Sequence, residues 1–89
     1  MSSLYGFAYS EKSLDYLKTL QPKIRKQIIA KVQALALSPL PANAKLVQGM
    51  TDGEDRVYRV RSGDYRILYV IREPTIIVLD IDHRKDVYR

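Results

Sequence analysis

The chain begins with an apolar stretch that leads into a helical pattern. Leu4–Tyr9 is apolar and aromatic and carries no charge, which is typical of a short strand. Ser10 followed by Glu11 then indicates a helix N-terminus, because a serine side chain caps free amides and an acid suits the first turn. This helix is predicted to extend to about Leu20. Its expected buried face is formed by Leu14 and Leu17.

A second helical pattern follows a short break at Gln21–Pro22. Proline suits the first position of a helix, and the prolines after Ser38 end it. Four apolar residues recur along this helix at intervals of four, four and three: Ile24, Ile28, Val32 and Leu35. Because only the short break separates the two helices, they are predicted to form an antiparallel hairpin.

The second half of the chain changes to the alternating pattern of strands. Two turn signals, Ser62–Gly63–Asp64 and Glu73–Pro74, separate runs that are rich in valine, isoleucine and tyrosine. The predicted strands are Arg56–Arg61, Tyr65–Ile71 and Thr75–Asp82, with a weaker short strand around Lys45–Val47.

This order of elements predicts an α+β fold: an N-terminal strand, an antiparallel helical hairpin and then an antiparallel β-meander. The hairpin is expected to cover one face of the sheet and to leave the other partly open as a shallow concave surface. Residues 1–89 are expected to form a single domain with one modest core, because a chain this short buries only about 60% of its unfolded surface. Tyr65 and Tyr69 are predicted to face that core, on the side opposite Arg66.

The length of the loop after Arg61 decides which arginines face one another. A two-residue loop of Ser62–Gly63 would set Arg59 opposite Arg66. A three-residue loop would instead set Arg66 opposite Val60, and the sequence allows both. In either case several arginines crowd near one turn, which predicts a phosphate site built on strands. The competing interpretation is a set of exposed arginines paired with Asp52, Glu54, Asp55 and Asp64.

The charge pattern also favours an anionic partner. The chain has 15 basic and 10 acidic residues, a net charge of +5. Seven of the eight basic residues after position 55 are arginines, whose planar fork matches the geometry of a phosphate. The simplest such partner is nucleic acid, and the alternative is a solvated strand surface with local acidic partners.

Composition excludes several kinds of site. The chain has no cysteine, which excludes disulfides, thiolate–zinc sites and a cysteine nucleophile, and its single histidine, His83, excludes a multi-histidine metal site. We therefore expect no metal and no cofactor. No apolar run approaches the ~20 residues that span a membrane, and the N-terminus lacks the pattern of a signal peptide. A soluble cytoplasmic protein without a membrane partner is expected.

Two motifs carry a resemblance to a known family. Residues 58–69 read YRVRSGDYRILY, and residues 81–89 read IDHRKDVYR. With the Ser-Pro helix end and the run at residues 46–49, these motifs resemble the RelE/ParE toxin superfamily, and the second motif favours its RelE-like branch. The resemblance covers essentially the whole chain. It implies the fold predicted above and a toxin of a type II toxin–antitoxin system, with the RelE branch acting as a ribosome-dependent mRNA endonuclease (mRNA interferase) that inhibits translation.

The resemblance implies four catalytic positions. Arg66 matches the family's transition-state arginine, and Arg84 matches the arginine after the last long strand. Tyr88 matches the C-terminal tyrosine, although its spacing from Arg84 is shorter here than in the best-studied member. His83 matches a basic position of the family, and some members use a histidine in this neighbourhood in catalysis.

A second set of residues is expected to bind the RNA. Arg59 and Arg61 match the basic residues of the preceding strand across a small gap, and Lys45 is placed with them. The lysines of the second helix, which otherwise form a solvated face, are expected to grip ribosomal RNA: Lys23, Lys26 and Lys31.

The chemistry requires a base for the 2′-OH of the RNA and positive charge at the phosphorane, and no metal ligands converge in the sequence. Tyr88 is one choice of base, although a phenol with an ordinary pKa of about 10 is a poor base at neutral pH unless nearby arginines lower that pKa. His83 is the other choice, because imidazole titrates near neutral pH. The sequence leaves the two open.

The resemblance also implies partners. These are a cognate acidic, RelB-like antitoxin, the ribosome and its mRNA, and operator DNA reached indirectly through the antitoxin. The alternative function is that of a ParE-like toxin that binds DNA gyrase and has no nuclease activity. A third is a non-toxic basic binding module.

Overall fold

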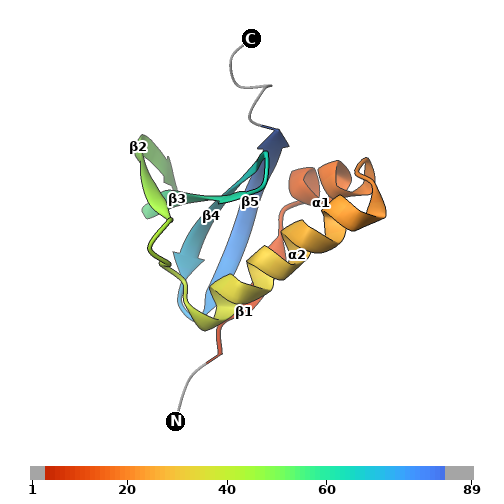
Figure 1. Cartoon of the computed structure of the whole chain (residues 1–89). Coiled ribbons are helices and arrows are strands. Elements are labelled where there is room, and N and C mark those ends of the chain that lie inside the picture. The colour runs from red at the N-terminus through yellow and green to blue at the C-terminus, as the bar shows by residue number, and fades with distance from the viewer. Residues whose placement is uncertain (1–3, 84–89) are drawn as a thin grey trace.

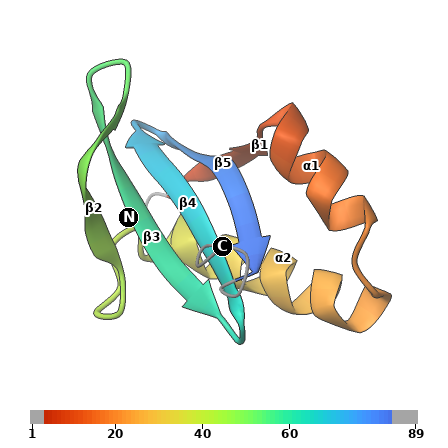
Figure 2. The same ribbon diagram turned by 90° about the horizontal axis from the view of Figure 1, so that it is seen from above.

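Two helices and a five-stranded sheet make up residues 4–83, the part of the chain that this computed structural model describes (Figure 1). The elements in chain order are β1 (Gly6–Tyr9), α1 (Glu11–Lys18), α2 (Pro22–Leu37), β2 (Lys45–Asp52), β3 (Asp55–Ser62), β4 (Tyr65–Arg72) and β5 (Thr75–His83). Both helices lie on one side of the sheet (Figure 2). The predicted α+β fold, with its N-terminal strand, helical hairpin and meander, is confirmed.

The strand order in the sheet is β1-β5-β4-β3-β2. Strands β2 to β5 form an antiparallel meander, and β1 joins its far edge in parallel with β5. The two helices therefore carry the chain from one edge of the sheet to the other. Strand β2 is longer than predicted, and its pairing with β3 is irregular between Leu46 and Thr51, where Gly49 has a φ of 76°. A positive φ suits glycine, which has no Cβ to clash.

Hydrogen bonds from side chains hold the helical hairpin in place. The amide of Ser13 donates to Oγ of Ser10 at 3.0 Å, which confirms Ser10 as the predicted N-cap. The Ser10 hydroxyl donates in turn to the carbonyl of Leu79 at 2.7 Å and so ties α1 to β5. Arg25 of α2 donates to the carbonyls of Leu17 and Leu20, at 3.0 and 2.8 Å, and closes the hairpin. Neither helix within residues 4–83 is long and apolar enough to cross a membrane.

The buried face of α1 differs from the prediction. Leu17 is buried, but Leu14 is 43% exposed, and Ser13 takes the second buried position. Residues 13 and 17 are one helical turn apart and lie on the same face of the helix. The Ser13 hydroxyl donates to the carbonyl of Ser10 at 2.9 Å, so its burial leaves no unpaired donor. A small hydrogen-bonded residue therefore lies where α1 meets the sheet, and the leucine faces outward.

The core forms between the helices and the covered face of the sheet. Val60, Ile67 and Ile81 lie directly opposite one another on β3, β4 and β5 and are almost fully buried. The α2 stripe packs against them through Ile28, Val32 and Leu35, while Ile24 is only partly buried at the edge. Tyr69 is fully buried and Tyr65 packs against the same cluster, which confirms both as core residues.

Tyr69 joins the core to the segment that follows α2. Its hydroxyl donates to the carbonyl of Pro39 at 2.7 Å, and burial raises the pKa of Tyr69 to about 12. A raised pKa means that this tyrosine stabilises the fold fully below pH 10, and that the contribution is lost as the pH rises from about 10 towards 12.

We expect Tyr69→Phe to lower the free energy of unfolding at pH 7 by about 1 kcal/mol, because one buried hydrogen bond is lost. Between pH 9 and pH 11 the parent should lose about 1 kcal/mol more stability than the variant, since only the parent has this hydroxyl to ionise. Urea unfolding of both proteins at pH 7, 9 and 11 measures the two effects. Parallel pH profiles would show that ionisation of Tyr69 does not govern alkaline stability.

Candidate functional site

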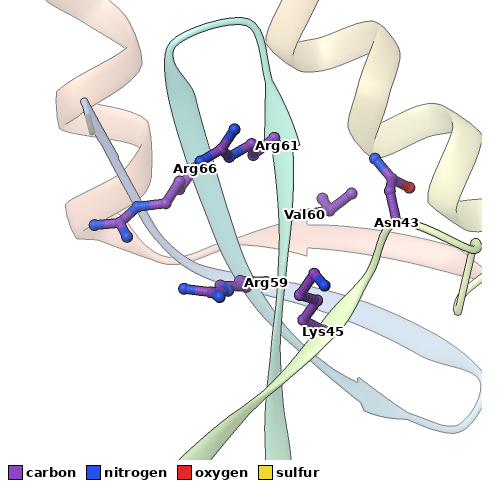
Figure 3. Close-up of a pocket in the computed structure, with 6 residues that line it drawn as sticks. All are labelled: Asn43, Lys45, Arg59, Val60, Arg61 and Arg66. Carbon is purple, nitrogen blue, oxygen red and sulfur yellow. The ribbon is translucent and has the colours of Figure 1, made fainter.

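A basic groove lies on the face of the sheet that the helices leave uncovered (Figure 3). Its volume is about 420 Å³. The residues that line it, which we call the basic groove, are Asn43, Lys45, Arg59, Val60, Arg61 and Arg66. Four of the six are cations and none is an acid, so the groove attracts anions.

Strand pairing brings these cations together. Lys45 of β2 lies directly opposite Arg59 of β3, and Arg61 of β3 lies directly opposite Arg66 of β4. Residues that are directly opposite share a face of the sheet, as do residues two apart on one strand. All four side chains therefore belong to the open face, and Val60 lies between Arg59 and Arg61 with its side chain in the core on the other face.

The loop that sets this pairing differs from both lengths considered from the sequence. Ser62 pairs with Tyr65, so the loop consists of Gly63 and Asp64, and both predicted registers are wrong. Gly63 has a φ of 60° at the first loop position, where the favoured hairpin turn of this kind requires a positive φ and hence glycine. The consequence is that Arg61, and not Arg59, is the residue opposite Arg66.

Arg66 is half-buried, whereas the other three cations of the groove are exposed, and it has an acidic neighbour. Its side chain is 14% exposed, and its Nε lies 3.3 Å from Oδ1 of Asp82, which sits opposite it on β5. Sequence reasoning missed Asp82. The signal that could have found it is the β4–β5 register, because an acid directly across from an arginine on one sheet face is within reach of it.

The other three cations of the groove have no acidic partner among the residues that the structure describes. Within residues 4–83, no ion pair joins Lys45, Arg59 or Arg61 to a carboxylate. Two of the acids proposed as partners bind elsewhere, because Asp52 and Asp55 lie 3.0 and 2.7 Å from Nη2 of Arg72. Hydrogen bonds to these carboxylates raise the pKa of Arg72. Within residues 4–83, the acids expected from the sequence therefore do not pair with the arginines of the groove, and the one acid that does is Asp82, beside Arg66.

The structure separates His83 from the groove. His83 lies opposite Tyr65 on β5, and the two rings meet edge to face with their centroids 4.9 Å apart. Tyr65 packs against the core and faces Tyr16 of α1, so His83 lies on the helical side of the sheet. The remaining predicted catalytic residues, Arg84 and Tyr88, lie outside the described residues.

The lysines predicted to bind ribosomal RNA lie on α2 and not in the basic groove. Lys23 and Lys26 are exposed, and Lys31 is half-buried. Lys31 also borders a second, shallower hollow that Arg61 shares from the β3 side.

Within residues 4–83 no group of three or more histidine, aspartate or glutamate side chains is placed to hold a metal ion. The described site is a cluster of cations carried by strands.

Comparison with known proteins places this geometry in a family. Residues 7–88 match the family described as the ParE toxin of the type II toxin–antitoxin system. The chain belongs to the RelE/ParE toxin superfamily. It is 31% identical to the candidate toxin RelE1 of Methanocaldococcus jannaschii over 81 residues. This aligned region covers 89% of each protein. The predicted membership of the RelE-like branch is thus confirmed.

Solved structures of RelE-like toxins share the fold. The archaeal RelE–RelB complex from Pyrococcus horikoshii matches with a TM-score of 0.77 and 22% identity, over 91% of this chain and 96% of the other. The toxin–antitoxin complex RelBE2 from Mycobacterium tuberculosis matches with a TM-score of 0.76 and 25% identity, over 91% and 99%. Together with the family match and the RelE1 relative, this shared fold identifies the chain as a RelE-like toxin of a toxin–antitoxin system.

Proposed function

We propose that this RelE-like toxin cleaves mRNA on the ribosome and thereby inhibits translation. The observation that carries the proposal is the basic groove. Four cations share one face of the sheet, and within residues 4–83 Arg66 alone among them has an acidic partner. Such a groove binds a polyanion and concentrates positive charge where negative charge develops in phosphoryl transfer.

The proposed step uses the 2′-OH of the RNA as nucleophile. The 2′-oxygen forms a bond to the adjacent phosphorus while the bond from that phosphorus to the 5′-oxygen of the next nucleotide breaks. A base takes the proton of the 2′-OH, and an acid returns a proton to the 5′-oxygen. The products are a 2′,3′-cyclic phosphate and a 5′-OH, so the step balances without a further reactant.

The residues divide this work according to their places. Arg66 and Arg61, directly opposite each other, stabilise the phosphorane, while Arg59 and Lys45 bind flanking phosphates. The resemblance to the family assigns Arg84 to the leaving group. Two sets of residues complete the proposal: Tyr88 as the base, and Lys23, Lys26 and Lys31 as contacts to ribosomal RNA.

Tyr88 is preferred to His83 as the base because of where His83 lies. The His83 ring packs against Tyr65 on the helical side of the sheet, across from the groove. A base must come within hydrogen-bond reach of the proton that it removes, either directly or through one water. A direct role for His83 would require its side chain to leave this contact.

We also propose that a RelB-like antitoxin neutralises the toxin. The solved relatives from Pyrococcus horikoshii and Mycobacterium tuberculosis are toxin–antitoxin complexes, and the net charge of +5 favours an acidic partner. Contact with operator DNA would be made through this antitoxin. The proposal places the toxin in the cytoplasm, where ribosomes translate.

A second candidate function is the inhibition of DNA gyrase without nuclease activity. The observation that favours it is the family match, because the matching family over residues 7–88 is that of ParE toxins. A gyrase-binding toxin has no need of a reactive centre, so the cations of the groove would serve binding alone.

Mapping of new RNA ends separates the two functions. The purified toxin is added to ribosomes programmed with a defined mRNA, to the same mRNA without ribosomes, and to a gyrase supercoiling reaction. We expect cuts in the ribosome-bound mRNA, none in the free mRNA and undisturbed supercoiling. Inhibited supercoiling with intact mRNA would replace the nuclease by the gyrase-binding function.

A further inference from the structure

Arg66 lies between a cation and an anion on the open face of the sheet. On one side it is directly opposite Arg61 of β3, and on the other it is directly opposite Asp82 of β5. Its Nε contacts Asp82 Oδ1 at 3.3 Å. Figure 3 shows the guanidinium groups of Arg66 and Arg61 held apart, with that of Arg66 extending away from β3.

We infer that Asp82 is a positioning residue that holds the Arg66 guanidinium apart from Arg61, so that a phosphate of the RNA fits between the two arginines. Two like charges directly opposite on a sheet destabilise it unless an anion lies near them. The Asp82 carboxylate supplies that anion from the far side of Arg66. This inference rests on the proposed function of the groove.

The contact leaves the terminal nitrogens of the Arg66 guanidinium available to bind a phosphate. A guanidinium has five N–H donors, and Asp82 engages the one on Nε. The terminal nitrogens keep their donors for a phosphate, which arginine binds with two parallel hydrogen bonds. The Arg66 side chain is 14% exposed and that of Asp82 is 28% exposed, so the pair is shielded from water more than an ordinary surface ion pair.

Asp82 has a second effect that opposes the first. Its negative charge weakens the attraction of the groove for a polyanion, while its hydrogen bond orders the group that stabilises the phosphorane. Removing Asp82 should therefore strengthen RNA binding and slow RNA cleavage. A residue that only supports the fold would weaken both together, so the opposite directions are the signature of the positioning role.

The test compares three variants with the parent protein. Asp82→Ala removes the charge and the acceptor, whereas Asp82→Asn removes the charge and keeps an acceptor oxygen. Asp80→Ala is the matched control, because Asp80 lies two residues away on the same face of β5 and pairs with Lys12 instead. Binding is measured with a fluorescent RNA oligonucleotide that carries 2′-O-methyl groups, and cleavage as the single-turnover rate on programmed ribosomes.

We expect all three variants to bind the oligonucleotide about threefold to tenfold more tightly, because each loses one negative charge beside the groove. Asp82→Ala should cleave about 10- to 100-fold more slowly than the parent. Asp82→Asn and Asp80→Ala should cleave within about threefold of the parent rate. Thermal melting of each variant confirms that the fold is retained.

Two results would overturn the inference while leaving the proposed function intact. One is an Asp82→Ala variant that cleaves at the parent rate while Arg66→Ala does not. The other is an equal loss of rate in Asp82→Ala and Asp82→Asn. A parent that does not cleave ribosome-bound mRNA is instead a failure of the proposed function. In that case NMR tests the contact between Arg66 and Asp82 independently of cleavage. The Arg66 Nε–H proton should exchange slowly with water in the parent and in Asp82→Asn, and rapidly in Asp82→Ala.

Discussion

Replacing Arg66 with alanine is expected to lower the single-turnover rate of mRNA cleavage by about 10²- to 10³-fold, the usual effect of removing a preorganised donor to a developing negative charge. Arg66 combines low exposure, an anchoring carboxylate and a place directly opposite Arg61. The loss should therefore appear mainly in the rate and less in ribosome binding, to which the other cations contribute. Quench-flow cleavage at saturating ribosomes measures the rate.

Arg72→Ala is the matched control for this experiment. It removes the same charge from the same strand, but Arg72 binds Asp52 and Asp55 outside the basic groove. Its cleavage rate should stay within about threefold of the parent, since exposed ion pairs contribute little to stability. Arg66→Lys keeps the positive charge but loses the planar guanidinium. Its cleavage rate should lie between that of the parent and that of Arg66→Ala. If Arg66→Ala and Arg72→Ala cleave equally fast, the groove is not the reaction centre.

Tyr88→Phe is expected to lower the cleavage rate by about 10²- to 10⁴-fold with ribosome binding unchanged, if its hydroxyl is the base of the reaction. The substitution keeps the ring and removes only the hydroxyl, so a loss of rate reports on the hydroxyl alone. Single-turnover cleavage and ribosome affinity, measured on the same preparation, separate chemistry from binding.

Tyr5→Phe serves as the comparison for Tyr88→Phe. Its hydroxyl donates to Glu73 at the other end of β5 from His83, and its loss should leave cleavage unchanged. A Tyr88→Phe variant that cleaves at the parent rate would transfer the base role to His83. His83→Gln should then lower the cleavage rate while ribosome binding stays unchanged. If Arg66→Ala, Tyr88→Phe and His83→Gln all remain fully toxic, the nuclease mechanism is wrong.

Local sequence signals identified most of the secondary structure. Ser10 caps α1, Pro22 opens α2, and the alternation in residues 56–82 gives the three later strands of the meander. These signals act through neighbouring residues, because a cap, a proline ring or a period of two constrains the backbone where it occurs. The buried face of α1 differs from the prediction, because the small hydroxyl side chain of Ser13 lies against β5 and hydrogen-bonds there, while Leu14 is exposed.

The candidate site was predicted in part. The arginines of β3 and β4 were expected to crowd at one turn, and the structure brings Arg59, Arg61 and Arg66 into one groove with Lys45. His83 was grouped with them, yet it lies on the other face, since neighbours along a strand alternate between faces. Arg84 and Tyr88 lie beyond the described residues, and their roles stay predictions.

The sequence by itself determined the fold class, the family and the presence of an arginine-rich surface, because these follow from periodicity, turn residues, motifs and charge. Only the tertiary structure decided which charges meet. A loop of Gly63 and Asp64 sets Arg61 opposite Arg66, and the β4–β5 register brings Asp82 beside it. Pairing between strands is a long-range property, and a shift of one residue moves every side chain to the other face of the sheet. The position and residues of a strand can therefore be predicted from the sequence, whereas the residues that lie opposite it depend on the register of the assembled sheet.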